Sequence, residues 1–180
     1  MPGPDADRSL PYSVNPMKKL LLCAALLAAP LAHADASHIP YAYTGTAATP
    51  AQPREAEIAA LFDRWNATLA TGDADRMTAL YAPDAVLEPT LSNQIRATPA
   101  DIRSYFVMFL QGKPQAVINY RQIRFLDDGA AVDMGVYTFT LSKNGKAQKV
   151  QARYTYVYKK IDGEWKIINH HSSLMPERAS

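Results

Sequence analysis

Glu88 is the side chain of this sequence best suited to acid–base chemistry. It ends a short apolar segment, Ala85 to Glu88, and Pro89 follows it directly. A carboxylate among apolar side chains is a stronger base than one in water, because burial disfavours its charged form, and proton abstraction needs such a base. In the alternative interpretation, Glu88 only hydrogen-bonds a neighbouring backbone or tyrosine group.

The adjacent histidines His170 and His171 are the next candidates for chemistry. Neighbouring residues of a strand point to opposite faces, so the pair cannot bind one metal ion within a subunit. The other two histidines, His33 and His38, lie near the N-terminus, and we therefore predict no metal site. We expect His170 to face a pocket near Tyr156 and His171 to face a dimer partner. An ordinary hydrogen-bonded histidine at a sheet edge is the simpler interpretation.

The amino-acid composition of the sequence argues against several classes of protein. The chain has 180 residues, a formal net charge of +2 and 48% hydrophobic residues, which suits one globular domain with tails. No long basic run occurs, so a nucleic-acid partner is not expected. Cys23 is the only cysteine and lies in a predicted export signal, so the exported chain would have no thiol chemistry.

The first 53 residues are predicted to precede the folded domain. Lys18 and Lys19, the apolar run from Leu20 to Leu31 and the sequence Ala32-His33-Ala34 have the order of a secretory signal cleaved before Asp35. That run is shorter than the roughly 20 residues of a spanning helix, so we expect a periplasmic or secreted protein without a membrane anchor. The predicted segments are a mis-assigned, disordered start (1–16), the signal (17–34), an extended leader (35–53), the domain (54–176) and a tail (177–180).

Three helices are predicted at the start of the domain. The first ends before Gly72, and its apolar residues recur at helical spacing: Ile58, Leu61, Phe62, Trp65 and Leu69. Asp73 is expected to cap a shorter second helix that runs through Tyr81 and that Pro83 ends. Thr98-Pro99-Ala100-Asp101 has the capping hydroxyl, first-turn proline and acid that begin a third helix, which Gly112 ends.

The rest of the domain has the pattern of strands. Asp-Gly and Asn-Gly dipeptides, which favour tight hairpin turns, separate four segments: 116–126, 130–141, 149–160 and 165–172. Alternation places Tyr154, Tyr156 and Tyr158 on one side of the third segment, and Tyr137 on the matching side of the second. Helices followed by an antiparallel meander predict an α+β domain in which the long helix crosses the tyrosine-rich face of a curved sheet.

Several short motifs occur in the order and spacing of a known family. They are Glu57-Ile58, Gly72-Asp73, Leu87-Glu88-Pro89, Tyr105-Phe106, Asp162-Gly163-Glu164-Trp165 and His170-His171-Ser172-Ser173. Over residues 55–176 the chain resembles the association domain of calcium/calmodulin-dependent protein kinase II, within the nuclear transport factor 2-like, SnoaL-like superfamily. The resemblance implies a cone-shaped α+β half-barrel that dimerises through its outer sheet face and has a pocket between the sheet and the first helix. The chain has no Gly-rich loop or catalytic-loop motif of a kinase.

The chain departs from that family at the pocket. Family arginines that suit small carboxylates align with Tyr137, Tyr156 and Ser172. A carboxylate would lose its charge-assisted hydrogen bonds there. We therefore expect a non-catalytic binding or self-association module, without a cofactor, whose pocket takes a small neutral or aromatic molecule. The expected pocket residues are Trp65, Tyr137, Tyr156, His170 and Ser172, with Glu88 as the catalytic candidate.

An enzyme is the alternative expectation. Similar half-barrels that isomerise ketosteroids carry an aspartate before a proline as general base, and Glu88-Pro89 resembles that arrangement. The chain could then be a cofactor-independent isomerase, dehydratase or cyclase. The tyrosine donor of those isomerases aligns with Trp65, however, and their protonated aspartate aligns near Arg153 and Tyr154. Hydrogen-bond donors would therefore stabilise an oxyanion of the substrate less well here than in those isomerases. The sequence for this reason favours the structural role of Glu88.

Overall fold

The computed structural model describes residues 43–176, which include the whole predicted domain. The predicted start (1–16), signal peptide (17–34), first part of the leader (35–42) and tail (177–180) lie outside the described residues. Between residues 43 and 176, no helix combines the length and the apolar character needed to cross a membrane.

Helices α2 and α3 begin where their capping residues predict. Helix α1 spans Pro53–Leu69, α2 spans Ala74–Thr78, α3 spans Pro99–Phe109, and a 3-10 turn, η1 (Leu110–Gly112), follows α3. The Asp73 carboxylate accepts hydrogen bonds from the N–H groups of Asp75 and Arg76 at 2.9 and 3.1 Å, and so caps α2. The Thr98 hydroxyl oxygen accepts from the Asp101 N–H at 3.2 Å and caps α3. Helix α2 is shorter than predicted.

A curved, mostly antiparallel sheet of five strands forms the second layer, which confirms the predicted α+β half-barrel. The strands are β1 (Tyr81–Glu88), β2 (Gln115–Phe125), β3 (Ala130–Lys143), β4 (Lys146–Ile161) and β5 (Glu164–Leu174), in the order β1-β5-β4-β3-β2. Strands β2 to β5 form the predicted meander. Strand β1, which is not among the strands predicted from the sequence, joins this meander at its edge and pairs with β5 in parallel.

Pro83 is the reason why strand β1 was not predicted from the sequence. This residue was expected to end the second helix, but Tyr81 already pairs with Ile167 in the sheet. The register of the pairing shifts between Tyr81 and Val86, where Pro83 and Asp84 are exposed. A proline cannot donate to the ladder, and an edge strand with an irregularity tolerates it.

Two of the three predicted hairpin turns have two residues. Asn144 and Gly145 have φ values of 52° and 73°, and Asp162 and Gly163 have values of 52° and 83°. Positive φ at both turn positions matches the twist of the flanking strands. The connection from β2 to β3 is a four-residue loop, 126–129, so the predicted tight turn there is wrong.

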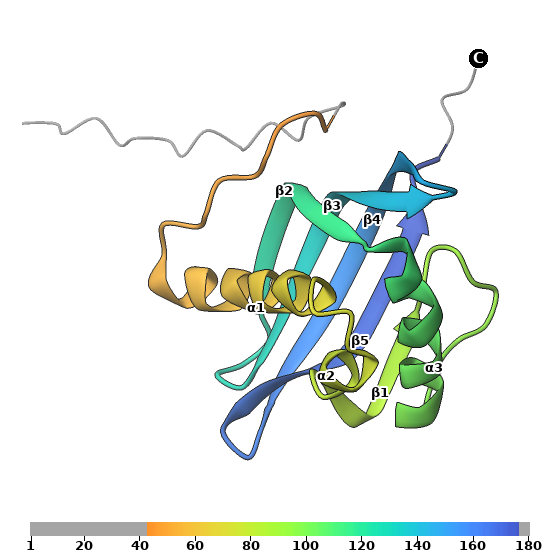
Figure 1. The fold of residues 1–180 in the computed structure, drawn as a ribbon. Helices are drawn as coiled ribbons and strands as arrows, with labels where there is room; N and C mark the ends of the chain where they lie inside the picture. Colours follow the sequence, from red (N-terminus) through yellow and green to blue (C-terminus); the bar gives the residue numbers. More distant parts are fainter. Residues whose placement is uncertain (1–42, 177–180) are drawn as a thin grey trace, which may run out of the picture. The chain divides into compact units, whose positions relative to one another are not determined.

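Helix α1 crosses the inner face of the sheet, and the core lies between them (Figure 1). Phe62 and Trp65 of α1 contact the tyrosines of the sheet, with ring centroids 6.4 Å apart for Phe62 and Tyr137 and 5.8 Å apart for Trp65 and Tyr156. Tyr137 and Tyr156 are both buried. The structure therefore places the predicted tyrosine face against the helix.

The described part of the leader packs on the sheet. The side chain of Gln151 donates to the Tyr43 carbonyl at 2.8 Å, and that of Asn119 donates to the Gly45 carbonyl at 2.7 Å.

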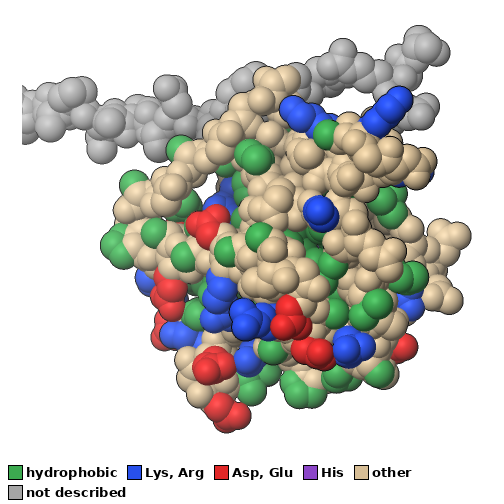
Figure 2. Space-filling view, viewed as in Figure 1, with side chains coloured by type: hydrophobic (Ala, Val, Ile, Leu, Met, Phe, Trp, Pro, Cys, Tyr) green, Lys and Arg blue, Asp and Glu red, His purple; other side chains and the backbone are tan. Residues whose placement is uncertain are grey.

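Acidic and basic side chains are interspersed on the face of the molecule shown in Figure 2. That face shows no broad patch of one sign.

Candidate functional site

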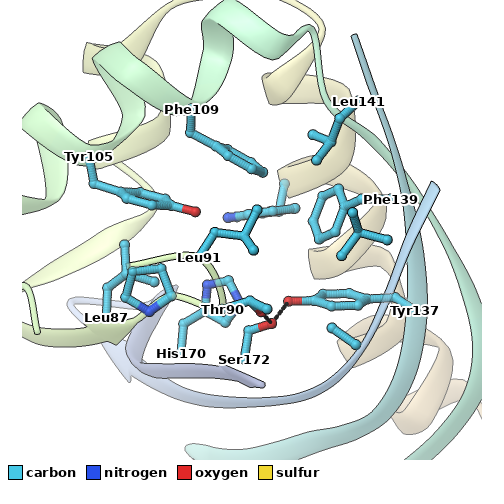
Figure 3. Close-up of a pocket in the computed structure, with 14 residues that line it drawn as sticks. Leu87, Thr90, Leu91, Tyr105, Phe109, Tyr137, Phe139, Leu141, His170 and Ser172 are labelled. Atoms are coloured by element: carbon cyan, nitrogen blue, oxygen red, sulfur yellow. Dashed lines mark hydrogen bonds between the residues drawn. The ribbon is translucent and has the colours of Figure 1, made fainter. Parts of the chain in front are cut away.

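A pocket lies between the inner sheet face, α3 and the loop after β1 (Figure 3). Its cavity is about 30 Å³, which is room for water or one small polar group. The pocket is thus narrower than the resemblance implied, because side chains fill most of the space. Its walls are formed by Trp65, Leu87, Pro89, Thr90, Leu91, Tyr105, Phe109, Tyr137, Phe139, Leu141, Val150, Ala152, His170 and Ser172.

The pocket wall carries no acidic or basic side chain apart from the imidazole of His170. Aromatic and aliphatic groups form most of it, and its polar atoms belong to hydroxyl groups, the indole and the imidazole. Four of the five predicted pocket residues line it: Trp65, Tyr137, His170 and Ser172. A wall of this kind suits an apolar ligand with few polar groups.

Strand β5 presents His170 to the pocket and His171 to the opposite, exposed face. The imidazole of His170 is buried and stacks on the Tyr156 ring with centroids 4.0 Å apart. Desolvation, together with the nearby His171, lowers the pKa of His170 from 6.5 to about 3. His170 is therefore uncharged at neutral pH.

A chain of two hydrogen bonds fixes the ring of His170. The Trp65 indole N–H donates to the Tyr81 hydroxyl oxygen at 3.1 Å, and that hydroxyl lies 3.0 Å from His170 Nδ1. An indole nitrogen can only donate, so the remaining partner for the Tyr81 hydrogen is Nδ1. Nδ1 then acts as an acceptor, and the imidazole proton is assigned to Nε2.

Three hydroxyl groups form a second chain in the pocket wall. The Tyr137 hydroxyl donates to Ser172 Oγ at 2.5 Å, and Ser172 Oγ hydrogen-bonds Thr90 Oγ1 (Figure 3). Desolvation raises the pKa of Tyr137, and the phenol stays protonated. Thr90 belongs to the loop after β1, so this chain ties that loop to β3 and β5.

Tyr156 lies behind the pocket wall. Its side chain is completely buried against His170, and its hydroxyl has no hydrogen-bond partner among the residues described. The ring supports the imidazole and does not line the cavity itself. Tyr156 is therefore the one predicted pocket residue that does not line the cavity.

Glu88 lies on the outer side of the sheet. Leu87 pairs with His170 and lines the pocket, whereas Glu88 pairs with His171 on the other face. The Glu88 carboxylate accepts a hydrogen bond from the Asn169 side chain at 3.2 Å. The sequence-based expectation that Glu88 faces the pocket does not agree with this geometry. Glu88 does hydrogen-bond a neighbour, as in the alternative interpretation, but the partner is the Asn169 side chain and not a backbone or tyrosine group.

A buried ion pair on the inner sheet face was missed in the sequence. Asp133 is completely buried and 3.2 Å from Arg121 Nε, and the Tyr154 hydroxyl donates to Asp133 Oδ1 at 2.9 Å. Strand alternation could have placed Asp133 on the same inner face of the sheet as Tyr137. Arg121 could not be placed in this way, because the register of β2 shifts between Ile118 and Tyr120. No group of three potential metal ligands occurs within residues 43–176.

One known protein family matches most of this chain. Residues 54–176 match the family described as the calcium/calmodulin dependent protein kinase II association domain. A crystal structure from Xanthomonas campestris, described provisionally as such a domain, has 62% sequence identity and a TM-score of 0.74. It matches 76% of this chain and 98% of its own. The chain belongs to this association-domain family. The predicted resemblance is confirmed.

Solved structures with lower sequence identity share the fold. The CamKII hub homology domain from Chlamydomonas reinhardtii is 22% identical over 67% of this chain and 97% of its own, with a TM-score of 0.58. A nuclear transport factor 2-like protein with a cystatin-like fold from Novosphingobium aromaticivorans is 12% identical over 68% and 82%, with a TM-score of 0.57. The comparison with curated proteins gives no significant match.

Proposed function

We propose that this protein is an exported, self-associating module whose pocket holds a small neutral or aromatic molecule. The uncharged, mostly apolar pocket wall, to which aromatic rings contribute, is the observation that carries the ligand class. A carboxylate entering it would lose water without gaining a cation, which is costly in an apolar site. Export rests on the predicted signal at residues 17–34 and places the module in the periplasm or outside the cell.

The family and the outer face of the sheet support self-association. Members of the family are described as association domains. On the outer face, Val132 and Val157 pair across β3 and β4, and Met134 lies two residues further along β3. These apolar side chains are only half-buried in the single chain. A homodimer formed through this face would cover them and gain hydrophobic burial.

The position of Glu88 favours binding over the isomerase, dehydratase or cyclase alternative. A general base must come within hydrogen-bond reach of the proton that it removes. Glu88 lies across the sheet from the pocket and already accepts from Asn169. An enzyme of the predicted kind would need another base, and none of the pocket residues is a carboxylate.

Native mass spectrometry of the chain from Asp35 onward tests this proposal. The spectrum should show a dimer or larger assembly, and gentle release should free a neutral small molecule from the purified protein. A chain that stays monomeric at all concentrations would contradict self-association. Salt-sensitive binding of benzoate stronger than that of neutral aromatic probes would contradict the proposed ligand class.

A further inference from the structure

The pocket contains a hydrogen-bond donor that the protein does not use. The Nε2 atom of His170 is buried and has no partner among the residues described. Because Tyr81 holds Nδ1 as an acceptor, Nε2 carries the imidazole hydrogen. A buried donor without a partner destabilises the protein, so a ligand that accepted its hydrogen would gain affinity from doing so.

The hydroxyl chain leaves a second hydrogen unused. Tyr137, Ser172 and Thr90 have one hydroxyl hydrogen each, and two hydrogen bonds join the three groups. One hydrogen therefore remains, and because Tyr137 donates to Ser172, it belongs to Ser172 or Thr90. Both residues line the same pocket as His170.

The pocket can widen through the movement of Leu91. This side chain lies in the middle of the ring of lining residues (Figure 3) and is nevertheless 61% exposed. Moving it outward would sacrifice little buried surface. The space of a leucine side chain would then join the cavity and admit a small ring next to His170.

We propose that the pocket selects a neutral carbonyl compound with an apolar or aromatic body, whose carbonyl oxygen accepts the hydrogen from His170 Nε2. The unused hydroxyl hydrogen of the Ser172–Thr90 pair serves as a second donor to such an oxygen. Trp65 and Tyr81 are positioning residues in this arrangement, because they hold the tautomer that makes Nε2 a donor. The inference rests on the proposed function and names the ligand class of the same pocket.

The tautomer is tested first, without a ligand. Nitrogen-15 NMR of histidine-labelled protein should show the hydrogen of His170 on Nε2. In Tyr81→Phe, which keeps the ring but removes the donor to Nδ1, the signals should shift toward a mixture of tautomers. A wild-type protein with the hydrogen on Nδ1 would overturn the inference.

The ligand class is tested with three probes. Acetophenone carries a carbonyl, α-methylstyrene replaces that carbonyl with a near-isosteric alkene, and benzoate is an anion. Their dissociation constants are measured for the wild-type chain, for His170→Phe and for the control His171→Phe, which makes the same change on the outer face. Native mass spectrometry and circular dichroism check that each variant folds and assembles like the wild type. Leu91→Ala serves as a variant with a wider entrance.

The ratio of the acetophenone and α-methylstyrene dissociation constants decides the outcome. Removing the donor in His170→Phe should shift this ratio against acetophenone by about two- to tenfold, the worth of one neutral hydrogen bond. The ratio should not change in His171→Phe. Equal ratios in all three proteins would overturn the inference and leave the proposed function standing. If no probe binds even to Leu91→Ala, or if benzoate binds best, the proposed function fails and the inference fails with it.

Discussion

The charge state of His170 depends on its burial at the centre of β5. Its ring lies between Tyr156 and the pocket, and Nδ1 accepts a hydrogen bond from a phenol. Protonation at Nδ1 would remove that acceptor, and the charged ring would have no water around it. The low pKa of His170, about 3, follows from this burial. The imidazole is therefore a neutral hydrogen-bond donor at neutral pH.

The stability of the fold should depend on pH through His170. The unfolded chain takes up a proton at this imidazole below pH 6.5, whereas the folded chain does so only near pH 3. The free energy of unfolding should therefore fall by about 1.4 kcal/mol for each pH unit below 6.5 because of this residue. Urea unfolding of the wild type and of His170→Phe between pH 4 and 7.5 measures the difference.

Comparison of the two proteins isolates His170 from Asp133. Desolvation raises the pKa of Asp133 to about 6, so this carboxyl contributes a slope of opposite sign between about pH 4 and 6. That slope is present in both proteins and cancels in their difference. His171→Phe should keep most of the wild-type pH dependence, because the burial that is the main cause of the low pKa of His170 is unchanged in it. A difference between wild type and His170→Phe that stays constant over this pH range would contradict the assignment.

At the scale of elements, local chemistry predicted most boundaries, but it did not predict the end of α2, strand β1 or the four-residue loop between β2 and β3. The caps at Asp73 and Thr98 and the turns at Asn144 and Asp162 act within a few residues, so the sequence shows them directly. Strand β1 is held by a partner about 85 residues away, and Pro83 suggested an ending where the strand continues. Because strand β1 was not predicted, the side of the sheet on which Glu88 lies could not be predicted either. The inward position of Arg121 depends on a bulge in β2 that no local pattern marks.

Gly135 permits the bulge of β2. A Cβ atom at this position would lie 1.9 Å from the Tyr120 carbonyl oxygen and 2.8 Å from its carbonyl carbon. These are backbone atoms, so no side-chain rotation relieves the contact. Gly135→Ala should lower the free energy of unfolding by about 3 kcal/mol and weaken amide protection along β2. Urea unfolding and hydrogen exchange measure the two effects.

Gly129→Ala is the matched control for this change. A Cβ atom there would lie 3.6 Å from Asp127 Oδ1 and 3.8 Å from Lys160 Cβ, which are ordinary contacts. Its effect on the free energy of unfolding should stay within about 0.5 kcal/mol. Similar losses in both variants would show that the bulge does not require a glycine.

At the scale of the whole molecule, the two faces of the sheet differ in what covers them. The inner face is closed by α1 and α3 around aromatic side chains, and this face carries the pocket. The outer face has no helix packed on it in the part of the chain described, and the leader covers part of it through Gln151 and Asn119. Sequence alternation predicts this division, but it cannot show which outward residues stay uncovered.

Met134 provides a test of assembly through the outer face. It lies half-buried beside Val132 and Val157, where a partner would enclose it. Met134→Lys would place an ammonium group in that interface without a paired acid, which costs more than the lost contact. Sedimentation velocity should therefore show the variant as a monomer at concentrations where the wild type is assembled, with an unchanged circular dichroism spectrum. Met108→Lys makes the same chemical change on α3, where the side chain is 58% exposed, and should leave the assembly intact. If Met108→Lys dissociates the assembly and Met134→Lys does not, the interface lies on the helical side, and the outer face of the sheet would be free for another role.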